Sequence, residues 1–290
     1  MPELPEVETI VIGLNKLVRG ASIKDVSYDW PKSFRISDNL LNNSLKGARI
    51  VDVKRRAKVI IIALNSGYSL LIHLKMTGQV VYESSKSRFG AGHPNDSLIS
   101  ALPDKSTRVI FTLRDDDGRL YFNDQRKFGW IKLVKSTKVP EDSFIKKLGP
   151  EPLDKAFNYS KFKARILTRS NSNIKAVLLD QTILAGLGNI YVDESLFFAK
   201  IHPLRKVQSL SNLEIKLLLK SIKTSLLKSL DLGGSTNRNY VNAEGQKGKY
   251  LDFAYVYNRA GQNCLVCRST ISKIRVAGRG THICLVCQVI

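Results

Sequence analysis

Four cysteines have the spacing that most directly indicates chemistry. All lie in the last 27 residues of the 290-residue chain, as Cys264, Cys267, Cys284 and Cys287. Two Cys-x2-Cys pairs separated by 16 residues match a tetrahedral four-thiolate zinc site, in which each pair supplies two sulfurs from one tight turn. Two disulfides are the alternative, but disulfides are rare inside cells, where we expect this chain to work. We therefore expect one structural Zn2+, because four protein ligands leave no open position for catalysis.

Between the two cysteine pairs, Gly278 and Gly280 flank Arg279. Glycines on both sides predict a sharp tip that projects one guanidinium. Such a tip suits contact with a phosphate, although zinc ribbons also serve contacts between proteins. Nucleic acid is the favoured partner for this motif.

The N-terminus is the second candidate for chemistry. Met1 precedes Pro2, a small residue, and the initiator methionine is usually removed before such a residue. Its removal leaves the secondary amine of Pro2 at the N-terminus, followed by Glu3. An α-amino group has a pKa of about 8, so part of it is unprotonated at neutral pH and can attack an aldehyde-like carbon to give an iminium. The neighbouring carboxyl group can donate or accept the proton. The alternative is ordinary helix capping, since prolines and acids such as Glu6 are common in a first turn.

The charge balance indicates the class of partner. Lys and Arg number 46 against 25 Asp and Glu, a formal charge of +21 that is spread over both halves of the chain. Such an excess points to a polyanion, nucleic acid before an anionic membrane. The longest apolar run, residues 59–64, is too short to span a membrane, and the acidic, proline-broken N-terminus is unlike a signal peptide. We expect an intracellular protein, and 43% hydrophobic residues exclude wholesale disorder.

The elements that must position these residues follow from periodicity. Apolar residues at helical spacing predict a helix over 5–19, with Gly20 as its stop. Ser211 and Glu214 form a capping box before another helix, and the glycines at 186 and 188 precede a helix over 190–199. Short β-rich runs predict an antiparallel sandwich or barrel: 48–53, 59–64, 70–74, 109–113, 120–123 and 130–134.

These elements predict an α+β fold in four parts. The first is an N-terminal β-sandwich or barrel with helices at 1–135, followed by a linker at 136–153. A helical module at 154–235 follows, and residues 236–290 form a loop and a zinc ribbon.

A series of motifs resembles bacterial formamidopyrimidine-DNA glycosylase, the 8-oxoguanine repair enzyme. The motifs occur in order over essentially the whole chain: 2–9 (PELPEVET), 55–58 (RRAK), 73–78 (HLKMTG), 123–129 (NDQRKFG), 148–153 (LGPEPL), 179–181 (LDQ), 186–194 (GLGNIYVDE) and 278–281 (GRGT) within the zinc ribbon. The resemblance implies a β-sandwich, a helix–two-turn–helix module and a zinc ribbon, with damaged duplex DNA bound between the two halves of a monomer in the bacterial cytoplasm, associated with the nucleoid.

The resemblance also implies catalytic roles. Pro2 is the expected nucleophile at C1′ of the damaged nucleotide, and Glu3 the proton donor to the sugar ring oxygen. Lys58 matches a lysine associated with β-elimination and phosphate contact. Arg279 matches an arginine linked to δ-elimination and to the phosphates flanking the lesion.

Six further residues are expected to contact DNA by the same resemblance. Met76, Arg126 and Phe128 match three side chains that fill the space left when the damaged base leaves the stack. His73 and Asn189 match phosphate-binding residues, and Lys175 is carried over from a basic DNA-contacting position in that segment.

The chain departs from the family pattern at several positions. Lys75 stands where the family usually has Gly, and Ser106 where many members carry a DNA-contacting His, for which Arg108 is a candidate replacement. The loop at 90–103 is longer than usual, and the loop expected to cap the lesion, 235–249, is the least similar part.

Two rival functions stay open. An endonuclease VIII-like enzyme removes oxidised pyrimidines with the same Pro-Glu chemistry, although Leu4, Arg126 and Phe128 favour the purine-acting branch. A catalytically silent zinc-ribbon protein that binds DNA or RNA is the other rival, but this chain retains Pro2, Glu3 and Lys58.

Overall fold

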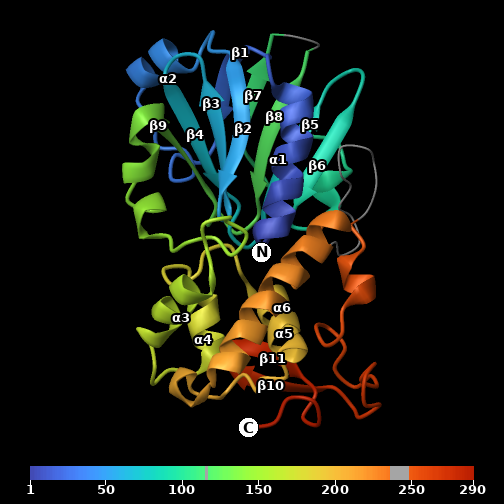
Figure 1. Cartoon of the computed structure of the whole chain (residues 1–290). Coiled ribbons are helices and arrows are strands. Elements are labelled where there is room, and N and C mark those ends of the chain that lie inside the picture. Colours follow the sequence, from blue (N-terminus) through green and yellow to red (C-terminus); the bar gives the residue numbers. More distant parts are fainter. Residues whose placement is uncertain (115–116, 236–247) are drawn as a thin grey trace. The chain divides into compact units, whose positions relative to one another are not determined.

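The computed structural model describes residues 1–114, 117–235 and 248–290. The chain divides into two compact units, which are described separately (Figure 1). The N-terminal unit comprises Met1–Lys146 and Gly233–Gly248, and the C-terminal unit comprises Lys147–Leu232 and Lys249–Ile290. The four-part division expected from sequence remains a prediction: 1–135, 136–153, 154–235 and 236–290.

The N-terminal unit is a sandwich of two antiparallel sheets whose inner faces form one hydrophobic core. One sheet has the strand order β1-β7-β8-β5-β6 and the other β2-β3-β4-β9. The strands are β1 (Ile23–Tyr28), β2 (Ile50–Arg56), β3 (Val59–Leu64), β4 (Tyr68–His73), β5 (Gly78–Glu83), β6 (Arg88–Gly92), β7 (Thr107–Leu113), β8 (Arg119–Asp124) and β9 (Trp130–Lys135).

Helix α1 (Leu4–Val18) covers one side of this sandwich (Figure 1). Its apolar face is buried, and the helix contacts β2 and β6, which are edge strands of the two sheets. Gly13 lets the helix approach β6 closely, because a Cβ at this position would lie 2.6 Å from the Phe89 ring. The predicted helix is confirmed, and it ends just before Gly20, whose φ of +91° suits a stop. The short helix α2 (Asp38–Ser44) lies between β1 and β2.

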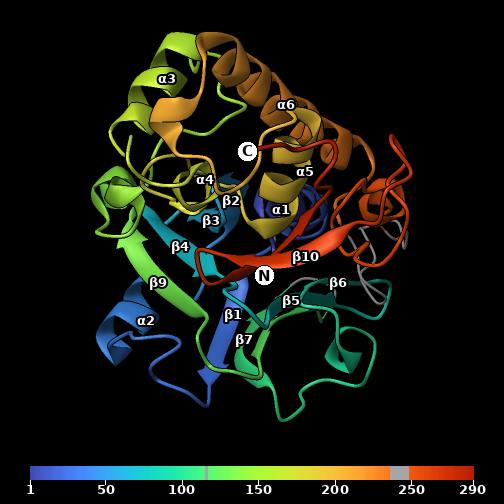
Figure 2. The same ribbon diagram turned by 90° about the horizontal axis from the view of Figure 1, so that it is seen from below.

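The C-terminal unit has four α-helices around a second core, and one hairpin in a segment with a small core of its own that includes Cys264 and Cys284. The predicted capping box at the start of α6 is present, since the backbone N–H groups of Ser211 and Glu214 each donate to the other's side chain. The hairpin packs against α5 through β11 (Figures 1 and 2). The helices of the C-terminal unit are α3 (Tyr159–Leu167), α4 (Ile174–Leu179), α5 (Asn189–Phe198) and α6 (Asn212–Asp231), and the strands of its hairpin are β10 (Ser272–Val276) and β11 (Arg279–Ile283).

The α+β class is therefore confirmed, with sheets in the first unit and helices plus a small β-hairpin in the second. In the ranges that the structure covers, none of the helices combines the length and the apolar character needed to cross a membrane.

Candidate functional site

Several strand ends meet at one end of the N-terminal sandwich. Strand β2 returns as β3 through the two-residue turn Ala57–Lys58, where Ala57 has a φ of +52°. Val59, the first residue of β3, pairs with His73 at the end of β4, and His73 pairs with Trp130 at the start of β9. Lys58 and His73 are thereby placed at the same end of the same sheet.

Helix α1 begins at this end of the sandwich. The side chain of Asn15 accepts a hydrogen bond from the Val53 N–H at 3.1 Å, and about two turns nearer the start of the helix Glu8 forms an ion pair with Arg55. The contacts of α1 thus move toward the end of β2 as they approach the start of the helix. Pro2, which precedes α1, therefore lies at the end of the sandwich that carries Lys58.

Glu3 caps the helix that follows it. Its backbone N–H donates to Oε2 of Glu6 at 2.9 Å, and its own side chain accepts from the backbone of Glu6. The capping interpretation of these acids is therefore correct as local structure. It does not exclude chemistry, since the cap holds Glu3, a residue that is only 3% exposed, directly beside buried Pro2.

Glu6 also holds the start of the segment expected to cap the lesion. Its Oε1 accepts hydrogen bonds from the backbone N–H and the hydroxyl of Ser235, both at 2.7 Å. One carboxylate thus contacts both the N-terminal turn and the first residue of the predicted 235–249 loop. The remainder of that prediction, residues 236–247, lies outside the described residues.

His73 is a buried, neutral imidazole. Its ring packs against Trp130 and Phe144, with ring centroids 5.6 and 5.3 Å away. Burial lowers the pKa of His73 to about 3, helped by the positive charges of Lys75 and Lys58. Nδ1 accepts the Lys75 N–H at 2.9 Å, so the ring proton belongs on Nε2. In this tautomer Nε2 can donate a hydrogen bond to a phosphate oxygen.

Met76, Arg126 and Phe128 lie on two connections that pass from one sheet to the other at this same end. Met76 is half-buried in the turn between β4 and β5, while Arg126 and Phe128 are exposed in the connection between β8 and β9. The Arg126 guanidinium lies 4.8 Å from the centre of the Phe128 ring, which is 56% exposed. Both side chains are therefore open to solvent and within reach of a partner.

The departures at Ser106 and Arg108 have a structural explanation. Ser106 is buried and donates to Asp104 through its hydroxyl at 2.7 Å. Arg108 is also buried; it pairs with Asp29 at 2.5 Å and donates to the backbone oxygen of Asp124 at 3.0 Å. Arg108 therefore joins β7 to β8 and to the residue after β1 within one sheet. Its buried guanidinium is engaged inside the protein, which argues against a replacement of the DNA-contacting histidine.

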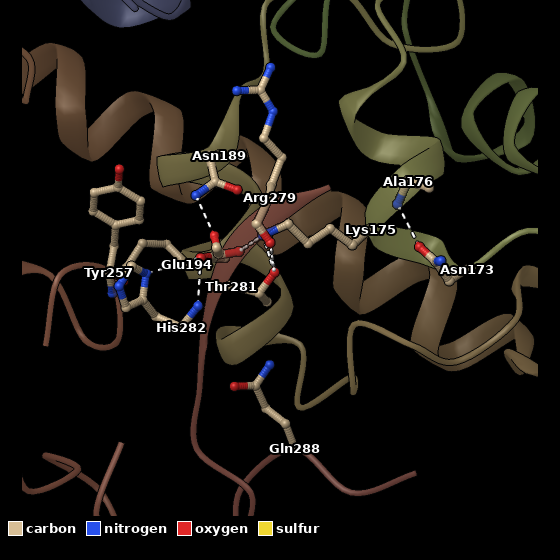
Figure 3. A network of polar contacts seen from close by, with 12 residues as sticks. Asn173, Lys175, Ala176, Asn189, Glu194, Tyr257, Arg279, Thr281, His282 and Gln288 are labelled. Atoms are coloured by element: carbon tan, nitrogen blue, oxygen red, sulfur yellow. Dashed lines mark hydrogen bonds and ion pairs between the residues drawn. The ribbon is translucent and has the colours of Figure 1, made fainter. Parts of the chain in front are cut away.

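In the C-terminal unit, Arg279 is the exposed first residue of β11. The tip itself consists of Ala277 and Gly278, both with positive φ, as a two-residue hairpin turn requires. The prediction that Arg279 forms the tip is therefore off by one residue, because Arg279 begins β11 and Gly280 lies inside the strand. The side chain of Asn189, at the start of α5, donates to the Gly280 carbonyl at 2.9 Å (Figure 3). Asn189 thus anchors the hairpin beside the helix N-terminus.

Lys175 is fully buried, which argues against the direct DNA contact expected from sequence. Its Nζ donates to Asp193 Oδ1 at 2.6 Å and to the Thr281 hydroxyl at 2.7 Å (Figure 3). The other oxygen of Asp193 accepts the His282 N–H at 2.9 Å. The buried pair therefore fastens α4, α5 and the hairpin strand β11 together. On the surface of this segment, Arg169 is an exposed cation.

We expect Lys175→Met to destabilise the C-terminal unit by about 3 kcal/mol, because it leaves the Asp193 carboxylate buried without its partner. Urea unfolding monitored by circular dichroism measures this loss, and Arg169→Ala serves as the exposed control. Unchanged unfolding together with weakened DNA binding in Lys175→Met would restore Lys175 as a DNA contact.

The four cysteines form a metal site. Their sulfur atoms lie within 4.8 Å of one another, with 3.9 Å between Cys264 and Cys287 and 3.4 Å between Cys267 and Cys284. Tetrahedral Zn–S bonds of about 2.3 Å place sulfurs about 3.8 Å apart, so the cluster fits zinc. These separations are far longer than a disulfide bond of about 2.05 Å, and none of the four cysteines forms a disulfide, which favours zinc over the disulfide alternative. The protein therefore binds one structural zinc ion, which orders the segment that carries Arg279.

Loss of one ligand should release the metal. We expect Cys284→Ser to abolish stoichiometric zinc and to weaken DNA cleavage, because the hairpin loses its anchor. Zinc content by atomic absorption measures the first effect, and Ser269→Ala, which removes a hydroxyl 3.1 Å from the Cys284 sulfur, is the control that keeps four ligands. One zinc per chain in Cys284→Ser would contradict the assignment.

Family models cover most of the chain. The formamidopyrimidine-DNA glycosylase N-terminal domain matches residues 1–131, and the H2TH (helix–two-turn–helix) domain of the same enzyme matches 148–241. The zinc finger found in FPG and IleRS matches 261–289, which includes all four cysteines.

Known proteins match the chain over its full length. Formamidopyrimidine-DNA glycosylases from Bacillus cereus and Desulfitobacterium hafniense are 39% and 36% identical, with at least 99% of each chain covered. Among solved structures, a Lactococcus lactis FPG mutant in complex with Fapy-dG-containing DNA matches with a TM-score of 0.87 at 36% identity. The Lactococcus lactis Fpg in complex with abasic-site DNA matches with a TM-score of 0.86 at 35% identity. Each match covers 99% of this chain and 99% of the other. The chain therefore belongs to the formamidopyrimidine-DNA glycosylase family.

Proposed function

We propose that this protein removes oxidised purines, such as 8-oxoguanine and formamidopyrimidines, from duplex DNA and then cleaves the strand by β,δ-elimination. Its family makes the chain a base-excision repair glycosylase that acts on damaged DNA. The observation that carries the proposal is the placement of Pro2 and Glu3 at the end of the sandwich that also carries Lys58.

The N-terminal pair supplies the chemistry. After removal of Met1, the Pro2 nitrogen attacks C1′ and the bond from C1′ to the base breaks. The base departs with the bonding electron pair and takes up the proton that the Pro2 nitrogen loses. Glu3 protonates the ring oxygen, so that the sugar opens and an iminium links Pro2 to C1′. Loss of a C2′ proton then expels the 3′ phosphate, loss of the C4′ proton expels the 5′ phosphate, and water hydrolyses the iminium to free Pro2. Lys58 and Arg279 bind these phosphates and favour their departure.

The target base must leave the helix stack, at a cost of a few kcal/mol. Met76, Arg126 and Phe128 supply a flexible thioether, a guanidinium and an aromatic ring to occupy the space that remains. The thioether fills the gap, the guanidinium pairs with the unpaired cytosine, and the ring stacks on a neighbouring base. The exposure of Arg126 and Phe128 supports this role.

The grip on undamaged DNA comes from charge and from phosphate contacts. His73 offers Nε2–H, and Asn189 lies at the first turn of α5, where backbone N–H groups favour an anion. The net charge of +21 supplies binding that is independent of sequence and weakens with salt. We propose that the protein searches the bacterial nucleoid as a monomer in this way.

Two duplex substrates test the proposal against its rivals. One carries 8-oxoguanine opposite cytosine and the other an oxidised pyrimidine such as 5-hydroxyuracil. Preferred excision of the purine, with phosphates left on both ends of the gap, supports the proposal. Preference for the pyrimidine would favour the endonuclease VIII-like activity. The absence of a covalent adduct after borohydride treatment, on either substrate, would favour a silent DNA-binding protein.

A further inference from the structure

The two connections that carry Met76 and the Arg126–Phe128 pair lie against each other. Gly78, the first residue of β5, pairs with Asp124, the last residue of β8. The turn that ends at Gly78 and the connection that begins after Asp124 therefore join the sheet side by side. Gly129 allows a close approach at the end of this connection, because a Cβ there would lie 2.7 Å from the Phe122 ring and would displace it.

Thr77 and Asp124 join these two connections through side chains. The Thr77 hydroxyl donates to Oδ1 of Asp124, and both groups accept the backbone N–H of Arg126, at 3.1 and 3.2 Å. The other carboxylate oxygen of Asp124 accepts the Gly129 N–H at 2.6 Å. One buried carboxylate thus fixes both ends of the segment that carries Arg126 and Phe128, and one hydroxyl ties this segment to the residue after Met76.

Because Thr77 and Asp124 are buried, their polar groups need hydrogen-bond partners inside the protein. Asp124 has no exposed surface and Thr77 is 8% exposed, whereas Phe128 is 56% exposed. A buried carboxylate needs hydrogen-bond donors on both oxygens. An asparagine of the same shape has one oxygen and one NH2 group, so it cannot accept from both Thr77 and Gly129. An aspartate is therefore required by the number of donors that converge on this point.

We propose that Thr77 and Asp124 are positioning residues that couple Met76 to Arg126 and Phe128, so that the three side chains enter the base stack as one unit. The inference rests on the proposed function, since it concerns how the stack is opened. Neither Thr77 nor Asp124 reacts with DNA in this scheme. They set the position of the side chains that do contact it, and a coupled unit resists return of the extruded base better than three independent side chains.

Two substrates separate this role from a general structural one. Opening of the stack is needed for excision of 8-oxoguanine, whereas a preformed abasic site has already lost its base. We expect Asp124→Asn and Thr77→Val to lower kcat/KM on the 8-oxoguanine:cytosine duplex about tenfold, as the loss of a buried hydrogen bond to a charged group does. Cleavage of the abasic duplex should change less than about threefold. Thr77→Ser, which keeps the hydroxyl, should restore excision.

A double-mutant cycle with Met76→Ala and Phe128→Ala tests the coupling itself. In the wild type, the two substitutions together should cost less than the product of their separate effects on excision, and in Asp124→Asn they should become independent. Independent effects in the wild type would overturn the proposal, as would equal losses on both substrates in Asp124→Asn and Thr77→Val. A wild-type protein that cleaves neither substrate would instead refute the proposed function.

Discussion

Blocking the amine of Pro2 is expected to lower covalent trapping of the protein on abasic DNA by at least about a thousandfold, the scale on which enzymes lose rate when a nucleophile is removed. An uncleaved glycine-serine extension before Pro2 converts the secondary amine into an amide, which cannot form an iminium. The extension has room to leave the fold, since Met1 is 42% exposed while Pro2 is buried. Borohydride reduction followed by gel electrophoresis measures the adduct.

Pro5→Ala is the matched control. Pro5 is also buried in the first turn of α1, so this variant changes a nearby proline without touching the amine. It should trap DNA about as well as the wild type does. Peptide mapping of the reduced wild-type adduct locates the link, which we expect on the N-terminal peptide. An adduct on the peptide that contains Lys58, or undiminished trapping by the extended chain, would move the nucleophile away from Pro2.

The elements predicted from sequence are those with a strong local signal. The helical spacing and Gly20 define α1, and the dense apolar run at 59–64 coincides with β3. Strand β6 has no such signal, because Arg88–Gly92 contains two glycines in five residues. It is a strand because β5 supplies a complete antiparallel register for it. That register depends on the whole sheet, so no local sequence pattern predicts it.

The site divides in the same way. The cysteines, whose residue type and spacing alone indicate a metal site, can be predicted from sequence. The DNA contact predicted for Lys175 comes from the family resemblance, and burial is a property of the tertiary structure that a sequence motif does not reveal. Asp124 and Asp193 were missed for the same reason. Both stand inside recognised motifs, at 123–129 and 186–194, and an acid inside such a motif is the signal that could have indicated them.

Glu3→Gln is expected to separate base excision from strand cleavage. Glutamine keeps an oxygen that can accept the backbone hydrogen bond of the cap, so α1 should stay formed. It cannot donate the proton that opens the sugar ring, and general-acid catalysis of this kind contributes about 100- to 10,000-fold. We therefore expect excision of 8-oxoguanine to fall at least about 100-fold. A preformed abasic site is mainly a cyclic hemiacetal, but it opens reversibly to the aldehyde in water without an enzyme. Its trapping by borohydride should therefore fall much less.

The two roles of Glu3 can be distinguished because they predict different patterns of loss. If Glu3 acted only as a helix cap, Glu3→Gln would leave both activities nearly intact, and Glu3→Ala would lower the melting temperature and reduce both activities together. If Glu3 is the proton donor, Glu3→Gln loses excision while its melting temperature stays at that of the wild type. Glu8→Gln is the control for removing an acid from the same helix, since its carboxylate contacts Arg55 one turn further along. Parallel losses on intact and abasic substrates in Glu3→Gln would contradict its role in sugar opening.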